Sequence, residues 1–447
     1  MTFHKVLVAN RGEIALRVIE ACRERSLESV AVFSQADERM PYLRLATEAI
    51  CIGPADPAKS YLSIPAVLSA AVVSRAQAIH PGYGFLSENP HFVEVCEGHG
   101  LTFVGPDKAA MELAGNKWKA REAVALAGVP ILPGERLAES SNGWEEAGDR
   151  VGYPLLVKAL FGGGGRGIRL VKDRSGLAAA VALARREAGR AFGVPDVYLE
   201  RALSNPRHIE VQILGDCEGR VLHVGERECS IQRRHQKLIE EAPAPSLDQA
   251  LRTRLRQAAV AAGRAIGYRN AGTVEFLLDE RGEFFFMELN ARIQVEHPVT
   301  EMIAGMNLVA LQLRLAAGGS LAPFGPEIGL SGHAIECRIN AEDPDHGFLP
   351  SCGRVEIDEL PGGVGIRVDT HLWNGMEVVP HYDSLLAKII AWGRDREESR
   401  TRMYTALERF RIRGVATTRS LAQEVISHPA FREERAGTGF LDELLSG

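Results

Sequence analysis

Two acidic residues face each other across a predicted β-hairpin, and no other feature of the sequence constrains the fold as strongly. Residues 272–278 and 283–290 read as strands joined through a turn at residues 279–282. A hairpin centred on this turn sets Glu275 directly opposite Glu288. Like charges in that position destabilise a sheet unless a proton or a cation lies between them. The hairpin therefore predicts a ligand-binding pair of strands rather than a solvated edge.

A polar pattern continues beyond the hairpin. From residue 288 to residue 296 every second residue is polar or charged, so an extended chain places these side chains on one side. They are Glu288, Asn290, Arg292, Gln294 and Glu296. Carboxylate and amide oxygens suit Mg²⁺ or Mn²⁺, particularly where phosphates complete the shell. Alternation alone favours an edge strand with a solvated face, but the opposed pair Glu275–Glu288 reverses that preference.

Composition narrows the class of protein. A chain of 447 residues is long enough for two to four domains, and its net charge of −6 argues against non-specific binding to nucleic acid or anionic membranes. Seven cysteines with no C-x-x-C spacing predict neither a disulfide framework nor a zinc ribbon, which fits a reducing cytoplasm. No apolar stretch approaches the roughly 20 residues that span a bilayer, and no signal peptide is expected.

The first hundred residues alternate between strand and helix patterns. Strands are expected at residues 6–9, 30–33, 78–80 and 101–104, each followed by turn or polar residues. This pattern predicts a doubly wound parallel sheet, whose ligand sites lie at the carboxyl ends of the strands.

A glycine-rich turn follows the third of these strands. Residues 80–89 contain the Pro-Gly and Gly signals of a tight turn, and Ser87 is expected to cap the next helix. Turn chemistry alone and a ligand-binding loop are both compatible with this segment.

The central region carries a run of glycines between two strands. A helix is expected at residues 117–127, and strands at 155–159 and 168–171 flank the run at 162–167. This is not a Walker loop, but bare backbone N–H groups approach phosphates closely. The alternative is a flexible linker, against which Lys158 before the run and Arg166 inside it argue.

Later segments add strands, donors and a third unit. Strands are expected from residue 197 and at residues 205–214, and residues 226–237 are dense in hydrogen-bond donors. Cys229 is expected to pack rather than react, because no partner histidine is identifiable locally. Residues 330–447, with a helix at 396–409, read as an α+β unit.

Seven motifs occur in a fixed order along the chain. They occupy residues 9–15, 80–89, 162–167, 205–210, 232–237, 292–298 and 336–342. Together they resemble the biotin carboxylase family of ATP-grasp enzymes, over nearly the whole chain. The resemblance implies an N-terminal α/β domain at 1–113 and an ATP-grasp domain at 114–329. It also implies a mobile glycine-rich lid at about 131–203 and a C-terminal α+β domain at 330–447.

The resemblance implies a reaction in two steps. ATP, with Mg²⁺ or Mn²⁺, phosphorylates bicarbonate to carboxyphosphate, and the CO₂ that this releases is captured by N1′ of biotin. No lysine is flanked by methionines, so the family's biotin-attachment motif is absent and biotin is expected on a separate biotin carboxyl carrier protein. The resemblance also implies carboxyltransferase subunits as partners, an acyl-CoA acceptor (acetyl-CoA favoured), a homodimer and a cytoplasmic location.

The family's functional residues map onto this sequence. Matches to the nucleotide site are Lys117, Lys158, Gly164, Gly165, Glu200, Leu203, His208, Gln232 and His235, joined by the acidic pair. Matches to the metal ligands are Glu275, Glu288 and Asn290. Matches to the bicarbonate site are Lys237, Arg292, Gln294, Val295 and Glu296, and Arg338 and Tyr83 match the biotin end.

Four of these residues are expected to be catalytic. Glu296 is expected to remove the bicarbonate proton, and Arg292 offers a planar fork for the anion. Lys237 is expected beside them, and Arg338 is expected to stabilise the biotin enolate.

Some positions depart from the family pattern. Leu160-Phe161 precedes the glycine run where small residues are usual, Ala291 replaces a hydroxyl residue, and Arg201 stands where lysine is frequent. Two alternatives stay open. One is an ATP-grasp ligase that forms another acyl phosphate, and the other is a non-catalytic regulatory paralogue.

Overall fold

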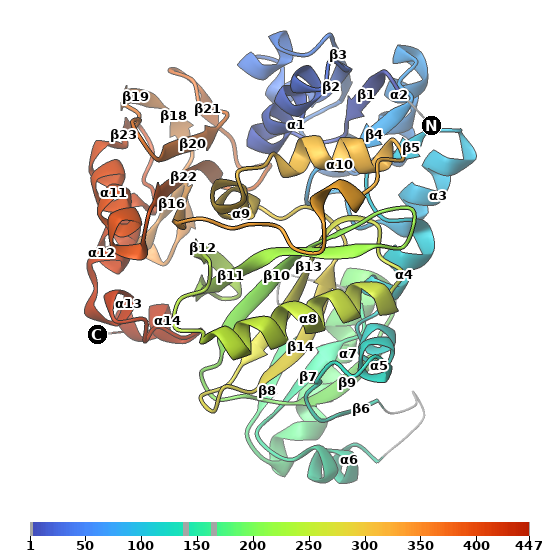
Figure 1. The fold of residues 1–447 in the computed structure, drawn as a ribbon, viewed down its shortest axis with the longest axis vertical. Coiled ribbons are helices and arrows are strands. Elements are labelled where there is room, and N and C mark those ends of the chain that lie inside the picture. Colours follow the sequence, from blue (N-terminus) through green and yellow to red (C-terminus); the bar gives the residue numbers. More distant parts are fainter. Residues whose placement is uncertain (1–2, 137–142, 162–167, 447) are drawn as a thin grey trace.

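The N-terminal part of the molecule is a doubly wound parallel sheet, as the sequence predicts. A computed structural model describes residues 3–136, 143–161 and 168–446 of the chain (Figure 1). The first sheet has the strand order β3-β2-β1-β4-β5, and all its pairs are parallel. Its strands are β1 (Lys5–Val8), β2 (Glu28–Ser34), β3 (Glu48–Gly53), β4 (Ala78–His80) and β5 (Thr102–Phe103). The helices around it are α1 (Gly12–Glu24), α2 (Ile64–Ser74), α3 (Pro90–Gly98) and α4 (Lys108–Gly115).

Two details of this part differ from the sequence-based expectation. Strand β3 was not predicted, because this edge strand is half exposed and lacks a buried apolar run. The prediction that Ser87 caps a helix is wrong. Helix α3 begins later, and the Asn89 side chain accepts the backbone N–H of Phe92 at 3.1 Å, since Pro90 occupies the first helical position.

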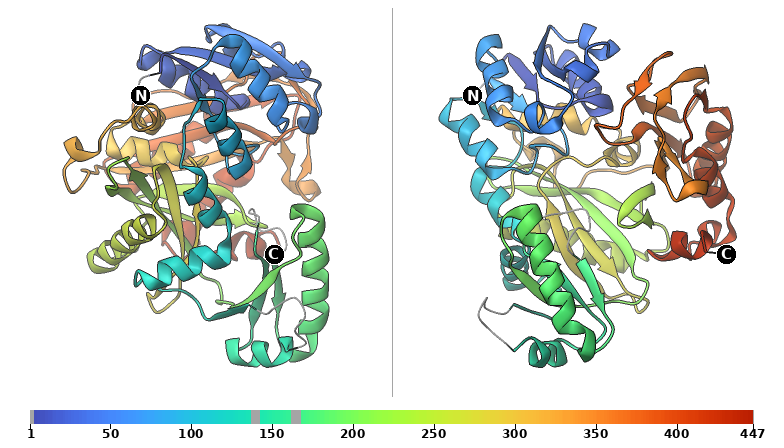
Figure 2. Two further views of the ribbon diagram at one scale, coloured as in Figure 1. Left: turned by 90° about the vertical axis from the view of Figure 1, so that its right-hand side faces the viewer. Right: turned by 180° about the vertical axis from the view of Figure 1, so that it is seen from behind.

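A small antiparallel sheet projects at the opposite end of the molecule (Figures 1 and 2). Its strand order is β6-β9-β7-β8. Its strands are β6 (Gly134–Arg136), β7 (Leu155–Ala159), β8 (Ile168–Val171) and β9 (Val197–Arg201). The helices of this region are α5 (Lys117–Leu126), which leads into it, α6 (Trp144–Val151) and α7 (Leu177–Phe192). The predicted bounds of β7 and β8 are confirmed.

An eight-stranded antiparallel sheet forms the centre of the molecule. Its order is β14-β13-β10-β11-β12-β15-β22-β20, so it runs without a break across residue 330. Its strands are β10 (Arg207–Gly215), β11 (Val221–Arg233), β12 (Gln236–Ala242), β13 (Asn270–Leu278), β14 (Phe284–Asn290), β15 (His333–Asn340), β20 (Ile366–Thr370) and β22 (Leu385–Gly393). The helices between them are α8 (Gln249–Ala265), α9 (His297–Ala304) and α10 (Leu308–Ala316).

Short elements and four helices complete the C-terminal part. The short strands are β16 (Glu342–Asp343), β17 (Leu349–Pro350), β18 (Gly353–Arg354), β19 (Glu356–Glu359), β21 (Glu377–Val378) and β23 (Arg411–Arg413). The helices are α11 (Arg396–Arg409), α12 (Arg419–Ser427), α13 (Pro429–Arg432) and α14 (Phe440–Leu444). Helix α11 has the predicted bounds. The expected fold class, α/β and α+β multidomain, is confirmed.

The two faces of strand β15 explain how the sheet brings charged groups together. Ile335, Cys337 and Ile339 face the helices α11 and α12 and belong to one apolar cluster. On the other face, Ala334 packs with Val299 of α9. Side chains alternate along a strand, so Glu336 and Arg338 lie on this second face, where α9 covers the sheet. The polar site develops on that covered face.

Two further observations bear on the class of protein. All seven cysteines are free, and Cys229 is buried as expected. Within residues 3–136, 143–161 and 168–446, no helix combines the length and apolar character that a membrane crossing requires.

Candidate active site

The predicted hairpin exists with the predicted register. Strands β13 and β14 pair antiparallel with Glu275 opposite Glu288 and Thr273 opposite Asn290. Glu275 is buried, and the Glu288 carboxylate accepts a hydrogen bond from Lys117 Nζ at 2.6 Å. The lysine at the start of α5 thus lies beside one member of the opposed acidic pair.

The prediction that the chain stays extended to Glu296 is wrong. Strand β14 ends at Asn290, the chain bends, and α9 begins at His297 with Pro298 in its first turn. Glu296 therefore stands at the amino end of a helix rather than on a strand. The polar side chains still converge, but they do so because the chain turns back over the sheet.

Lys237 lies at the centre of the converging carboxylates. Its Nζ donates to Glu210 and to Glu296, each at 2.6 Å, and to Glu275 at 2.9 Å. These acceptors match the three N–H donors of an ammonium group. Burial alone lowers the pKa of Lys237, but the attraction of the three carboxylates outweighs it and raises that pKa well above its ordinary value.

Glu296 is held in the ionised form. Arg338 Nη2 donates to its second carboxylate oxygen at 2.9 Å. Burial raises the pKa of Glu296, but Lys237, Arg338 and Arg227 oppose this effect and hold the pKa well below its ordinary value. Burial also opposes ionisation of Glu275, yet Lys237 and His208 lower its pKa well below the ordinary range.

Arg227 donates hydrogen bonds to side chains around the Lys237 cluster. Its side chain is completely buried, and its guanidinium donates to Glu210. It also donates to Thr273 Oγ1 and to Gln294 Oε1, each at 3.0 Å. Gln294 in turn donates to Glu275 Oε1 at 2.8 Å. One guanidinium thereby orients members of three separate segments of the chain.

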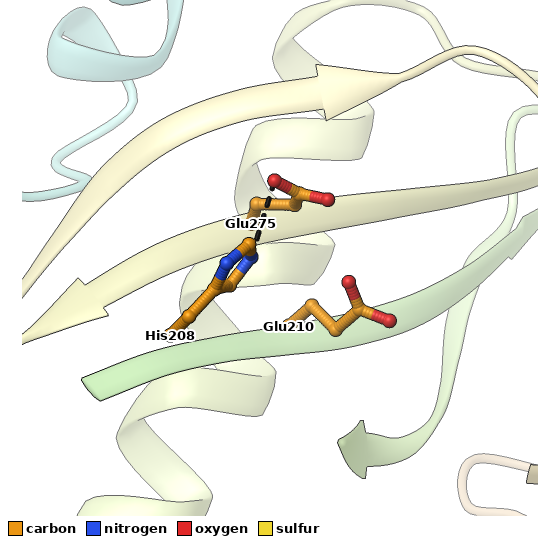
Figure 3. Close-up of side chains that lie close together, drawn as sticks. All are labelled: His208, Glu210 and Glu275. Carbon is orange, nitrogen blue, oxygen red and sulfur yellow. Dashed lines mark ion pairs between the residues drawn. The ribbon is translucent and has the colours of Figure 1, made fainter. Parts of the chain in front are cut away.

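One cluster of potential metal ligands differs from the predicted set. His208, Glu210 and Glu275 point toward one another from two adjacent strands (Figure 3). His208 Nε2 lies 3.1 Å from Glu275 Oε2. We do not interpret the cluster as a metal site, because Lys237 already supplies its positive charge. The set Glu275, Glu288 and Asn290 offers only oxygen ligands, and the buried Asn290 Nδ2 has no hydrogen-bond partner among the described residues.

A second buried ion network lies where the adenine end is expected. Glu200 on β9 accepts Arg121 Nη1 at 2.7 Å and also pairs with Lys158 on β7. All three side chains are buried. Arg201, one of the departures, donates from Nε to the Val151 carbonyl at 2.7 Å. Its side chain is thus anchored on α6.

Three further nucleotide-site predictions fall among the described residues. Gln232 is buried on β11, and His235 stands in the β11–β12 turn with a φ of 67°. Leu203 is half-buried between β9 and β10. Gly164 and Gly165 lie outside the described residues.

Tyr83, one of the residues predicted at the biotin end, belongs to a network of hydrogen bonds and ion pairs that joins the N-terminal and C-terminal parts of the molecule. Tyr83 donates its hydroxyl hydrogen bond to Glu13 of α1. The buried Lys388 of β22 lies 3.1 Å from Glu13 Oε1 and donates to the Val295 carbonyl at 2.9 Å. Val295 therefore enters the site through its backbone.

Arg292 makes one short hydrogen bond and two long ones, so its terminal nitrogens can still bind an anion. Its Nε donates to Glu88 Oε2 at 3.0 Å, and its two terminal nitrogens make long contacts, with the Ile293 carbonyl at 3.3 Å and with Asn290 Oδ1 at 3.4 Å. The adjacent departure, Ala291, is buried in the apolar core, as its expected orientation away from the anion requires.

Sequence reasoning missed several residues of the site. They are Glu88, Arg121, Glu210, Arg227, Glu240 and Lys388. For Glu210 a signal existed, since it is a charge inside a strand whose neighbours are apolar. For Lys388 the signal was a lone lysine within the run Leu385–Gly393. Neither signal names the partner, which comes from a distant segment.

Three family models cover almost the whole chain. "Biotin carboxylase, N-terminal domain" matches residues 2–111, and "Biotin carboxylase C-terminal domain" matches residues 336–443. Between them, "Carbamoyl-phosphate synthase L chain, ATP binding domain" matches residues 116–323. The chain belongs to the biotin carboxylase family. It is an ATP-dependent ligase that carboxylates biotin.

Curated relatives agree over the full length. The chain is 49% identical to the biotin carboxylase of Nostoc sp., covering 99% of this chain and 100% of the relative. It is 49% identical to the biotin carboxylase of Pseudomonas aeruginosa as well, covering 99% of this chain and 98% of the relative.

Solved structures share the fold. One is the Campylobacter jejuni biotin carboxylase–β,γ-ATP complex, with a TM-score of 0.96, 44% identity and 99% coverage of both chains. Another is the biotin carboxylase domain dimer of the Hydrogenobacter thermophilus 2-oxoglutarate carboxylase, in complex with MgADP, ADP and bicarbonate. Its TM-score is 0.95 at 45% identity, covering 99% of this chain and 98% of that chain. The biotin carboxylase component of a pyruvate carboxylase matches with a TM-score of 0.84 at 44% identity, covering 99% and 98% of the two chains.

Proposed function

We propose that this chain carries out the first half-reaction of a biotin-dependent acyl-CoA carboxylase, with acetyl-CoA as the final acceptor. In this half-reaction ATP and bicarbonate form carboxyphosphate, and N1′ of biotin on a separate carrier protein takes up the CO₂. The observation that carries the proposal is the convergence of Lys237, Arg338 and the ionised Glu296 next to the acidic hairpin.

Proton removal from bicarbonate is assigned to Glu296. Its carboxylate takes the proton of the bicarbonate O–H bond, and the resulting oxyanion attacks the γ-phosphorus of ATP as ADP leaves. A carboxylate with a strongly lowered pKa is a weak base, so the anion that forms needs compensation. Arg292 and Lys237 supply it, because both are cations beside the carboxylate.

The nucleotide phosphates are assigned to two lysines outside the Lys237 cluster. Lys117 lies beside Glu288, and Lys158 projects from β7, the strand that precedes residues 162–167. Glu200, Leu203, His208, Gln232 and His235 are assigned to the nucleotide as well, together with Gly164 and Gly165. Transfer of a phosphoryl group requires mainly positioning and neutralisation of charge, which these groups provide.

A divalent metal fits the residues of the hairpin. Glu275, Glu288 and Asn290 offer hard oxygen ligands from the paired strands β13 and β14. Among the described residues Asn290 Nδ2 has no partner, and Asn290 Oδ1 accepts only the long contact from Arg292 at 3.4 Å, so this amide oxygen can turn to a metal. When bound, Mg²⁺ or Mn²⁺ would neutralise phosphate charge. Lys117, which pairs with Glu288 in this structure, would then turn to the phosphates.

The biotin end is assigned to Arg338 and Tyr83. Arg338 of β15 donates a hydrogen bond to Glu296. Its guanidinium suits the enolate that biotin forms when N1′ loses its proton. We also propose a biotin carboxyl carrier protein and carboxyltransferase subunits as partners, and a homodimeric assembly. The free cysteines support a cytoplasmic location.

The decisive experiment measures ADP formation by the purified chain. ATP cleavage should depend on bicarbonate and rise when free biotin is added. The Glu296→Gln variant should bind ATP normally and lose carboxylation by about 10²- to 10⁴-fold. The matched control Glu122→Gln changes a glutamate on the exposed side of α5 and should behave as wild type.

Two outcomes would contradict the proposal. Bicarbonate-independent ATP cleavage that consumes another acid and an amine would identify a different ATP-grasp ligase. Absence of any ATP cleavage in the folded wild-type chain would identify a regulatory paralogue. The acceptor is tested separately, by combining the chain with carrier and carboxyltransferase and comparing acetyl-CoA with pyruvate and 2-oxoglutarate.

A further inference from the structure

A second pair of opposed glutamates lies behind Arg338. Glu240 on β12 and Glu336 on β15 are direct cross-strand partners, and both side chains are completely buried. Among the described residues, neither oxygen of Glu336 has a hydrogen-bond partner, and the same holds for Glu240 Oε2. Glu240 Oε1 accepts Arg338 Nε at 2.7 Å. Opposed buried carboxylates with three unpartnered oxygens require a compensating charge.

None of the cations around the pair donates a hydrogen bond to Glu336 among the described residues. Arg338 on β15 holds Glu240 and Glu296. Lys388, which stands opposite Arg338 on β22, donates to the Val295 carbonyl and pairs with Glu13.

The helix that covers this face supplies no spare cation either, as far as the described residues show. On α9, burial first and then the nearby cations, Lys388 before Arg17 and Arg367, hold the pKa of His297 well below its ordinary value, so this histidine is neutral. Glu301, also on α9, is occupied by Arg17 and Arg367.

A metal ion does not explain the pair. The groups of potential metal ligands found among the described residues include neither Glu240 nor Glu336. Two cations, Arg338 and Lys388, already flank the pair and would repel a third. A proton is the remaining compensation. Burial opposes ionisation, and it raises the pKa of Glu240 to about 7 despite the attraction of Arg338, with repulsion from Glu296 adding to the rise. Burial also raises the pKa of Glu336 well above its ordinary value.

We propose that Glu336 is a neutral, protonated acid in the working enzyme and that its neutrality positions the charge of Arg338 for the biotin anion. This role rests on the proposed function of Arg338. If Glu336 ionised, Arg338 would be attracted by three carboxylates, those of Glu240, Glu296 and Glu336. This attraction would compete with the attraction between Arg338 and the biotin anion. Glu336 touches no substrate and is therefore a positioning residue. Loss of its proton should slow carboxylation of biotin more than bicarbonate-dependent ATP cleavage.

Glu336→Gln tests the proposal, because an amide imitates the protonated acid. The infrared carbonyl band of a protonated carboxyl, followed in glutamate-labelled protein, should lose one component in this variant. The matched control is Glu241→Gln on β12, the strand that pairs with β15. Glu241 is also buried, but Arg396 binds it at 2.8 Å and its pKa is lowered, since hydrogen bonds from His333 and Arg396 outweigh burial. That variant should keep the band.

Kinetics supply the second readout. At neutral pH Glu336→Gln should retain kcat for biotin carboxylation within about threefold of wild type, because a neutral isostere replaces a neutral group. The alkaline fall of kcat should move to higher pH or vanish, while the bicarbonate-dependent ATP cleavage changes less.

Each contrary result overturns a defined part. An unchanged infrared band shows that Glu336 is ionised and removes the proposal. A lost band with an unchanged alkaline limb removes the positioning role. If wild type and variant both lack bicarbonate-dependent ATP cleavage, the proposed function fails, although the band still reports the proton.

A second variant covers the case in which Glu336→Gln does not fold. Glu240→Gln should lower the pH at which the Glu336 band disappears, because a neighbouring negative charge is gone. A band that titrates as in wild type would overturn the proposal.

Discussion

Two groups of buried glutamates, on the central sheet and at the start of α9, differ in the direction of their pKa shifts. Glu210, Glu275 and Glu296 share the ammonium group of Lys237. Glu240 and Glu336 face each other, and among the described residues Glu240 accepts a hydrogen bond from Arg338 whereas Glu336 accepts none. In the first group the pKa values of Glu275 and Glu296 are lowered, because the nearby cations, Lys237 foremost, outweigh burial. In the second group burial prevails and both pKa values are raised.

Burial alone therefore does not decide the charge of a carboxylate. Desolvation costs several kcal/mol per ion in both groups. The Coulomb attraction of the nearby cations exceeds this cost for Glu275 and Glu296 but not for Glu240 and Glu336. The ionised group suits a base, and the protonated Glu336 suits a neutral support.

The largest effect is expected from removing the shared cation. Lys237→Met leaves three buried carboxylates without their common donor, so bicarbonate-dependent ATP cleavage should fall by about 10³-fold or more. The unfolding temperature should fall as well. ADP release and thermal unfolding measure both.

A surface lysine provides the control for this change. Lys108→Met breaks only exposed contacts with Glu94 and Glu112 and should leave both quantities near wild type. Wild-type activity in Lys237→Met would mean that the cluster does not serve the reaction.

A smaller loss is expected for Glu210→Gln. Glu210 binds both Lys237 and Arg227, so the amide removes one of the charges that hold each cation in place. We expect kcat to fall by about 10- to 100-fold with ATP binding retained. A selective loss of ATP affinity would contradict this assignment.

The two groups should oppose each other in the pH dependence of stability. Glu275 and Glu296 stabilise the fold above the ordinary carboxyl pKa of 4.5, and this contribution is lost as the pH falls below it. Glu240 binds its proton more tightly when folded, so stability falls as pH rises from about 4.5 to about 7.

Urea unfolding between about pH 5 and pH 8 measures the second effect. The free energy of unfolding of Glu240→Gln, relative to wild type, should rise by up to about 1.4 kcal/mol per pH unit across the lower part of this range. A constant difference between the two proteins would mean that Glu240 is ionised throughout.

The smallest effect is expected at Cys229, the neutral group between the two clusters. Burial is the main reason that the pKa of its thiol lies well above the ordinary value, so it should resist alkylation in the native protein while the exposed Cys51, Cys217 and Cys352 react. Cys229→Ala should keep activity within about threefold. Rapid labelling that inactivates the enzyme would contradict this expectation.

Local sequence patterns predicted much of the fold. The bounds of β7, β8 and α11 and the opposition of Glu275 to Glu288 follow from short-range signals, because hairpin turns and periodicity act over a few residues. The same reasoning failed beyond Asn290. Alternation of polar residues indicated a strand, but the following Pro298 and the cover of α9 over the sheet impose a turn and a helix.

Local sequence signals are sufficient to predict which acidic residues of the hairpin oppose each other and which motifs the chain shares with its family. The charges of the buried acids follow from contacts that form only when the chain folds. Lys237 reaches Glu275 and Glu296 from another strand, whereas no described cation donates a hydrogen bond to Glu336. Ionisation depends on the charges within a few ångströms of a buried group, and in this enzyme distant segments of the chain supply those charges.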